Sequence, residues 1–72
     1  MHNMKLQAAR AASNKTQKRV ASEAGISERL YQSYEYNKRR PSVDIAIRIA
    51  DALNIVDLRK LFGDDDRKST TK

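Results

Sequence analysis

Apolar residues recur along this chain at the three- and four-residue intervals of amphipathic α-helices, and glycine and proline interrupt the pattern at only three positions. Gly25, Pro41 and Gly63 each stand where one periodic segment ends or the next begins. The pattern therefore predicts helices separated by short turns. They are expected at residues 4–13, 17–24, 28–36, 43–53 and 57–62.

Residues at the ends of these segments support the predicted boundaries. Thr16, Ser27 and Ser42 directly precede the second, third and fourth segments, and their hydroxyls suit N-caps. Gly25 and Gly63 directly follow the second and fifth segments, where a C-cap needs the left-handed conformation that glycine adopts most readily. Five of the ten segment ends are thus marked.

The fourth segment also resembles a β-strand, because its apolar residues alternate with others from residue 43 to residue 49. Its charges favour a helix instead. Asp44, Arg48 and Asp51 follow one stripe of a helix, where opposite charges are neighbours. In a strand Asp51 would face away from the other two. We therefore predict an all-α protein.

The predicted helices imply one domain. A chain of 72 residues has the size of a single small domain, which buries only about 60 % of the surface that its unfolded form exposes. We expect the folded part to span residues 4–63. Residues 1–3 are expected to be a flexible N-terminus, and residues 64–72, which include no apolar residue, a disordered charged tail.

Composition excludes several classes of function. The chain has no cysteine, and its one histidine is His2, so neither a disulfide framework nor a Cys/His metal site is expected. We expect no enzyme, because a cysteine nucleophile and a well-placed histidine base are both missing. No cofactor or small-molecule ligand is expected. The sequence shows no signal peptide and no membrane span, so we expect a cytoplasmic, nucleoid-associated protein.

The distribution of charge points to a polyanionic partner. Fifteen Lys and Arg residues against nine Asp and Glu residues give a net charge of +6. The entire excess falls within residues 1–48, which include most of the predicted helices. A folded body with this charge has the electrostatic character of a nucleic-acid-binding protein, although basic surfaces also serve solubility.

The second and third segments, joined at Gly25, match a helix-turn-helix unit, whose second helix can enter the major groove of DNA. In that helix Leu30, Tyr31 and Tyr34 gather on one side. We expect both tyrosines to be core residues whose hydroxyls reach the surface, and Tyr36 to be the exposed tyrosine. The opposite arc presents Glu28, Arg29, Gln32, Ser33 and Tyr36.

Four side chains of this arc suit the edges of DNA bases. Arg29 can direct its forked N–H groups to guanine, and Gln32 can pair with adenine. Glu28 can accept from cytosine, and Ser33 is small enough for close approach. An ordinary solvated helix face has a similar composition, so the arc alone leaves both interpretations open.

Groups that suit DNA phosphates flank the base-reading candidates, and such groups are needed to fix the register of a recognition helix. The free N–H groups at the start of the second helix also favour a phosphate. Each cluster taken alone is also compatible with simple solvation. The candidates for phosphate binding are Lys15, Thr16, Gln17, Lys18, Ser27, Tyr36, Asn37, Lys38, Arg39 and Arg40.

Three stretches of this sequence, Thr16–Ala21, Gly25–Ser27 and Tyr31–Ser42, resemble the lambda-repressor-like family of Cro and Xre-type regulators. The resemblance covers about residues 4–62. It implies a compact five-helix bundle, a bacterial or phage transcription regulator and, by default, a repressor. It also implies that the partner is double-stranded operator DNA. By the same resemblance Gln17 contacts the DNA backbone, and Asn37 and Lys38 hold phosphate.

The resemblance also implies an ion pair between Arg10 and Glu35 that is structural rather than DNA-binding. Asn37 stands where the family commonly has glycine, which implies a positive φ that asparagine tolerates. Leu30 replaces a small polar residue of the family. It can touch a thymine methyl group, but its place on the apolar side favours packing against the second helix.

A homodimer on DNA is expected, because twofold symmetry doubles the base contacts. Apolar residues near the C-terminal end are candidates for the dimer contact, and the alternative is that they cap the core. They are Ile45, Ile55, Val56, Leu58 and Phe62. Two other functions remain open, namely a protein-interaction module of the antitoxin or anti-repressor type and nonspecific nucleic-acid binding.

Overall fold

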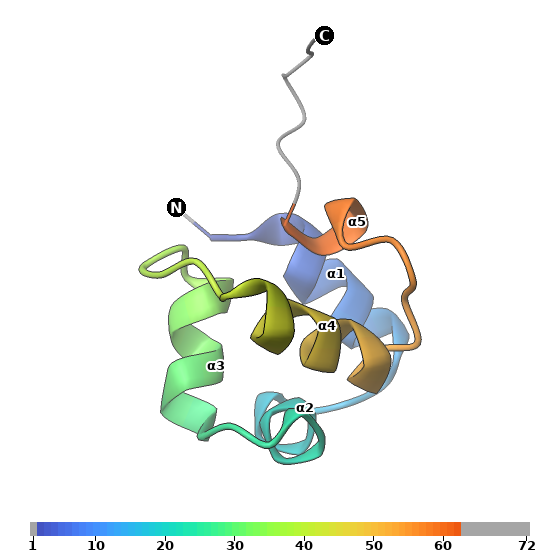
Figure 1. Ribbon diagram of the computed structural model, residues 1–72. Coiled ribbons are helices and arrows are strands. Elements are labelled where there is room, and N and C mark those ends of the chain that lie inside the picture. Colours follow the sequence, from blue (N-terminus) through green and yellow to red (C-terminus); the bar gives the residue numbers. More distant parts are fainter. Residues whose placement is uncertain (1, 63–72) are drawn as a thin grey trace, which may run out of the picture.

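The computed structural model describes residues 2–62, which form helices joined by turns (Figure 1). The helices are α1 (Met4–Ala12), α2 (Gln17–Ala24), α3 (Glu28–Glu35), α4 (Val43–Ala52) and α5 (Arg59–Phe62). This part of the chain contains no strand, so the helical interpretation of the fourth segment is confirmed. None of its helices is long and apolar enough to cross a membrane. The predictions for Gly63 and for residues 64–72 lie outside the described residues.

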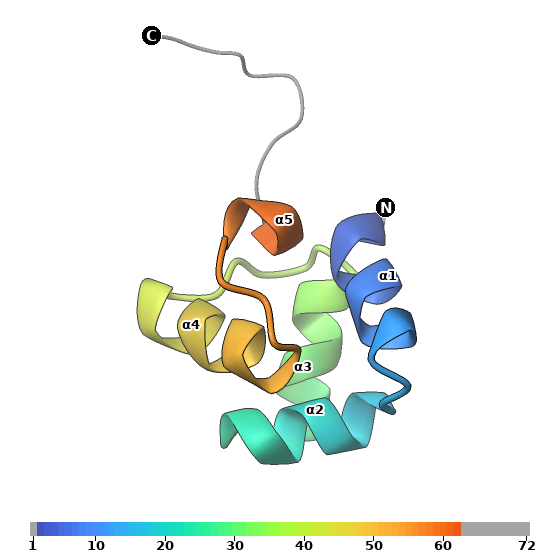
Figure 2. The same ribbon diagram turned by 90° about the vertical axis from the view of Figure 1, so that its right-hand side faces the viewer.

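The helices pack as a small bundle in which α4 lies against α2, α5 lies against α1, and α3 contacts both α1 and α2. Two perpendicular views show α2 and α5 at opposite ends of the molecule (Figures 1 and 2). The turn between α2 and α3 is therefore at the end remote from α5. The predicted five-helix, all-α fold is confirmed.

Each helix contributes a side chain to one shared core. Leu6, Val20, Tyr31, Ile49 and Leu61, one from each helix, are all 0 % exposed. They form a single cluster with smaller residues such as alanines of α2 and α4. Because burial of apolar surface is the main stabilising contribution, no helix of this bundle is stable apart from the others.

The caps explain where the helices begin. The side chains of Thr16, Ser27 and Ser42 accept hydrogen bonds from the backbone N–H groups three residues later, as the sequence predicts. Asn3 caps α1 in the same way, although the sequence did not predict this cap. Its Nδ2 also donates to the Leu61 carbonyl oxygen at 2.7 Å. Asn3 is therefore bonded to both α1 and α5.

A residue with positive φ follows each of the first four helices. Gly25 has φ 76°, and Asn14, Asn37 and Asn54 have φ values of 60°, 58° and 59°. Asparagine is the non-glycine residue best suited to this conformation, and it reverses the chain direction after a helix without a glycine. The prediction for Asn37 is confirmed, whereas Asn14 and Asn54 were not anticipated.

Most of the apolar residues considered for dimerisation pack against the core. Ile45, Ile55, Leu58 and Phe62 are partly buried and pack against the central cluster. Val56 alone of that set is exposed, at 98 %. The alternative that these residues cap the core therefore holds for four of the five.

Substitutions at two isoleucines of α4 test this assignment of core and surface. Ile49→Val removes a methyl group from a fully buried side chain, and we expect it to lower the free energy of unfolding by about 0.5–1.5 kcal/mol. The same change at Ile47, which is 46 % exposed, should have a much smaller effect. Urea denaturation of both variants measures the difference, and equal losses would contradict the burial described here.

Candidate nucleic-acid interface

The turn between α2 and α3 is fixed by local hydrogen bonds. The Gly25 N–H donates to the Ser22 carbonyl oxygen at 3.1 Å, and the Ile26 N–H donates to that of Ala21 at 3.0 Å. Ser27 Oγ then accepts from the Leu30 N–H at 3.0 Å and begins α3. These bonds set the direction in which α3 leaves α2, and they form the turn of a helix-turn-helix unit.

The inner face of α3 anchors it to the bundle. Tyr31 and Tyr34 are buried, and Leu30 is partly buried against the core, which is the packing position expected for it. The expectation that the Tyr31 hydroxyl reaches the surface was wrong. It is buried and donates a hydrogen bond to Glu35 Oε2 at 2.5 Å.

The outer face of α3 presents the polar residues for which the sequence predicts base contacts. Glu28 and Arg29 are exposed, and Gln32 and Ser33 are half-buried. Ser33 Oγ donates to the Leu30 carbonyl oxygen at 2.5 Å, which keeps this side chain close to the helix surface. The arc is thus a surface with two exposed charged residues at its start and two half-buried, uncharged polar residues behind them.

Behind the outer face of α3, side chains from three helices converge on the carboxylate of Glu35. This residue is 0 % exposed. Arg10 of α1 donates to it through Nε at 2.6 Å and through Nη2 at 3.4 Å. Gln17 of α2 donates to Oε1 from Nε2 at 3.0 Å, and Tyr31 of α3 supplies its hydroxyl. The ion pair implied by the resemblance is therefore present, and it belongs to a larger network that joins three helices.

These contacts shift the pKa values of the groups involved. Burial acts to raise the pKa of Glu35, but the hydrogen bonds from Arg10, Tyr31 and Gln17 together outweigh it and leave this pKa below its usual value. Burial raises the pKa of Tyr31, and its bond to Glu35 raises it further. Glu35 is therefore ionised and Tyr31 neutral at pH 7.

The basic loop after α3 folds back onto that helix. Asn37 turns the chain, and the backbone N–H groups of Lys38 and Arg39 both donate to the Ser33 carbonyl oxygen, at 2.8 and 3.3 Å. Lys38, Arg39 and Arg40 are exposed. The loop thus carries its positive charge at the C-terminal end of α3.

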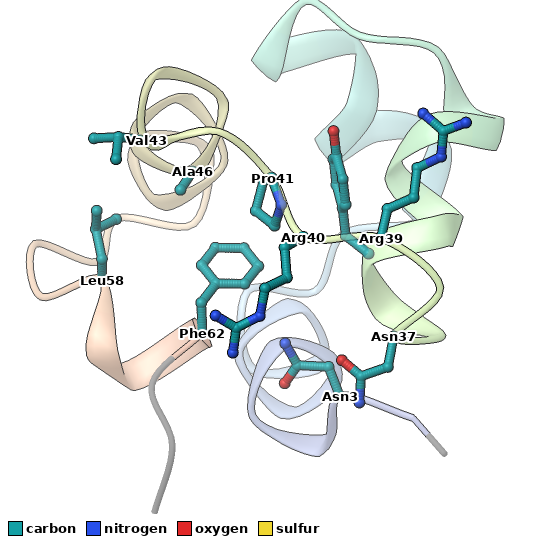
Figure 3. A pocket seen from close by; sticks show the side chains of 10 residues that line it. Asn3, Asn37, Arg39, Arg40, Pro41, Val43, Ala46, Leu58 and Phe62 are labelled. Carbon is teal, nitrogen blue, oxygen red and sulfur yellow. The ribbon is translucent and has the colours of Figure 1, made fainter. Parts of the chain in front are cut away.

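Two neighbouring arginines of this loop point in different directions. Arg39 lines a shallow pocket of about 220 Å³ together with Arg29 and Ser33 of α3, so it adjoins the base-reading candidates. Both arginines also line a second pocket, between the loop, α4 and α5, in which Figure 3 shows Arg40 extending toward Phe62 and the guanidinium of Arg39 directed away. Of the two, Arg39 is the one that extends the α3 surface.

Two of the predicted phosphate-binding residues make contacts within the protein that the sequence did not predict. Lys15 Nζ donates to Glu23 at 2.7 Å and to the Ala52 carbonyl oxygen at the end of α4 at 2.6 Å, so its charge is engaged by neighbouring protein groups. Tyr36 is half-buried rather than exposed, and its ring lies 4.9 Å from that of His2. Thr16 and Lys18 are exposed at the start of α2, and Ser27 is exposed at the start of α3.

One contact within the site was not predicted at all. Gln32 Nε2 donates to Gln17 Oε1 at 3.1 Å, so the polar arc of α3 is bonded to the first residue of α2. The sequence predicts a base contact for Gln32 and a DNA-backbone contact for Gln17, with no bond between the two residues. No local pattern relates two side chains that the fold brings together across a turn.

Comparison with known proteins identifies the family of the chain. Residues 6–61 match a protein family described as helix-turn-helix. The chain belongs to this family. The resemblance to lambda-repressor-like regulators that the sequence indicated is thereby confirmed.

Two relatives illustrate the family. Over 46 residues, which are 64 % of this chain, the sequence is 46 % identical to the cryptic phage CTXphi transcriptional repressor RstR of Vibrio cholerae serotype O1. The match spans 41 % of that repressor, so the chain corresponds to less than half of it. The crystal structure of the restriction-modification controller protein C.AhdI from Aeromonas hydrophila is similar, with a TM-score of 0.76 and 27 % identity over 83 % of this chain and 89 % of that one.

The buried carboxylate predicts a specific acid sensitivity. Because the pKa of Glu35 is lower in the folded than in the unfolded protein, its ionisation stabilises the fold above the unfolded pKa of about 4.3. That stabilisation is lost as the pH falls from there through the folded pKa. In Glu35→Gln, which we expect to be less stable at pH 7, the free energy of unfolding should fall less steeply below pH 4.3 than in the wild type.

The measurement is urea denaturation as a function of pH, and a second carboxylate provides the control. The pKa of Glu23 is also lowered, first by its hydrogen bond from Lys15 and then by that from Arg19, but its side chain is 33 % exposed. Glu23→Gln should therefore change the slope only slightly. Parallel pH profiles for the wild type and Glu35→Gln would contradict the role assigned to Glu35.

Proposed function

We propose that this protein is a sequence-specific double-stranded DNA-binding transcription regulator, and by default a repressor, with α3 in the major groove. One observation carries the proposal. The polar arc of α3 stands on a buried inner face and lies between the exposed N-terminus of α2 and a loop with three exposed cationic side chains. The match to a transcriptional repressor and the similarity to a controller protein support it.

We divide the surface into two kinds of contact. Glu28, Arg29, Gln32 and Ser33 face base edges, and Arg39 adjoins them. The remaining groups hold phosphates, at the start of α2, at the start of α3 and in the basic loop. They are Thr16, Gln17, Lys18, Ser27, Asn37 and Lys38, with Arg40 and Tyr36 at the margin. Lys15 is left out because Glu23 and Ala52 engage it.

Selection from a pool of random DNA duplexes tests the proposal directly. A sequence-specific regulator should enrich a short motif, because direct contacts to bases discriminate against wrong base pairs. A pool that stays random, with binding that depends only on charge, would contradict the proposal and favour nonspecific nucleic-acid binding. Absence of any DNA binding would instead favour a protein-interaction module on the same scaffold.

Two variants separate base contacts from phosphate contacts on the selected site. Arg29→Ala should lose about 1–3 kcal/mol of binding free energy and relax the preference at one base position. Lys38→Ala should weaken binding to selected and scrambled duplexes alike and flatten the dependence of affinity on salt. Fluorescence anisotropy titrations at several salt concentrations measure both effects. Lys60→Ala on α5 is the matched control and should leave the base preference unchanged.

We further propose that two copies bind DNA together, since one short recognition helix contacts few base pairs. Among the described residues, α4 offers an exposed apolar surface for the contact. Val43 and Ile47 are 70 % and 46 % exposed and lie one turn apart, so they share a face of the helix. Val56, at 98 % exposure, is a further candidate in the connection to α5.

A charged double variant tests this arrangement. Val43→Asp combined with Ile47→Asp should abolish cooperative binding to an inverted repeat, with a loss on the order of a hundredfold, and leave binding to a single half-site unchanged. Met4→Asp, at an exposed apolar position of α1, is the control. Sedimentation of the protein–DNA complex gives its stoichiometry. Two copies of the double variant bound cooperatively would overturn this part of the proposal.

A further inference from the structure

A continuous chain of hydrogen bonds runs from the buried interior to the base-reading surface. Arg10 and Tyr31 donate to the Glu35 carboxylate, and Gln17 Nε2 donates to its Oε1 at 3.0 Å. Gln32 Nε2 in turn donates to Gln17 Oε1 at 3.1 Å. The chain therefore connects a fully buried charge to a half-exposed side chain of α3 through a single glutamine.

The direction of every bond in this chain follows from the charge of Glu35. An ionised carboxylate only accepts hydrogen bonds, so Gln17 has to present its NH₂ group to it rather than its carbonyl oxygen. The low pKa of Glu35 keeps it in this form. The carbonyl oxygen of Gln17 then faces the other way, toward α3, where it can only accept a hydrogen bond. Gln32 therefore donates one of its N–H groups to Gln17.

This hydrogen bond limits the donors and acceptors that Gln32 can present to DNA. Its side chain has two N–H groups and one carbonyl oxygen, and one N–H is occupied by Gln17. One donor and one acceptor remain. Adenine presents an acceptor, N7, beside a donor, the N6 amino group, and matches this pair. Guanine presents two adjacent acceptors, N7 and O6, and would need both N–H groups.

We propose that Glu35, acting through Gln17, orients the amide of Gln32 so that this residue selects adenine and rejects guanine. Glu35 and Gln17 are then positioning residues for base recognition, in addition to their roles in the ion pair and beside the DNA backbone. The inference rests on the proposed function, because it assumes that α3 meets base edges. It adds that the specificity of one α3 residue is determined by a charge that never touches DNA.

The experiment compares base preferences at one position of the selected site. The position read by Gln32 is first identified as the one whose preference disappears in Gln32→Ala. At that position the wild type should prefer adenine over guanine by at least about fivefold. In Gln17→Met, which keeps the length of the side chain but removes its amide, the amide of Gln32 is free to rotate. The preference should fall to within about twofold, while preferences at the other positions persist.

Lys18→Met provides the matched control. It changes the neighbouring residue of α2, which is exposed and which we assign to phosphate. It should weaken binding to the adenine and guanine sites by the same factor and leave their ratio unchanged. Thermal denaturation of both variants verifies that each is folded at the temperature of the binding assay.

A second measurement needs no DNA. In the ¹H–¹⁵N spectrum of the free protein, the side-chain amide resonances of Gln32 should shift in Gln17→Met and stay in place in Lys18→Met, because only the first removes the acceptor of Gln32. A preference for guanine at the Gln32 position, or a preference for adenine that survives in Gln17→Met, would overturn the inference. Failure of the proposed function is distinguishable from this result, because no motif would then be enriched in the selection.

Discussion

A carboxylate that is withdrawn from water has to obtain donors from the protein, and Glu35 obtains them from three different helices. Arg10 comes from α1, Gln17 from α2 and Tyr31 from α3. The backbone carbonyl oxygen of Glu35 also accepts from the Asn3 N–H at 2.7 Å, and Asn3 donates in addition to Leu61 of α5. The C-terminal end of α3 is therefore the point at which most of the bundle is joined.

Such an arrangement contributes orientation more than net stability. Burying a charge costs free energy that its partners only approximately return, and well-packed apolar residues often stabilise a core equally well. Apolar contacts, however, are non-directional and tolerate small rotations. The donors around Glu35 have definite directions, so they hold α2 and α3 in one relative orientation. A protein that places α3 against base edges depends on that orientation, because base contacts are sensitive to small displacements.

The sequence predicts this fold well because its local signals agree. The caps at Thr16, Ser27 and Ser42 and the left-handed Gly25 are determined by residues within one turn of each helix end. The identity of the α3 surface follows from the same periodicity. What the sequence did not predict depends on tertiary contacts. Lys15 meets Ala52 across 37 positions of the chain, and the bond from Asn3 to Leu61 spans 58.

The shared core has a consequence for how this surface can be controlled. The four residues of α5 supply Leu61 to the same cluster that holds the inner face of α3, although α5 and α2 lie at opposite ends of the molecule (Figure 1). Leu61 also accepts a hydrogen bond from Asn3 through its backbone carbonyl oxygen. Cleavage of the connection between α4 and α5 would leave this residue held by non-covalent contacts alone, and we expect it to weaken the core beneath α3 without touching any residue of the helix-turn-helix surface.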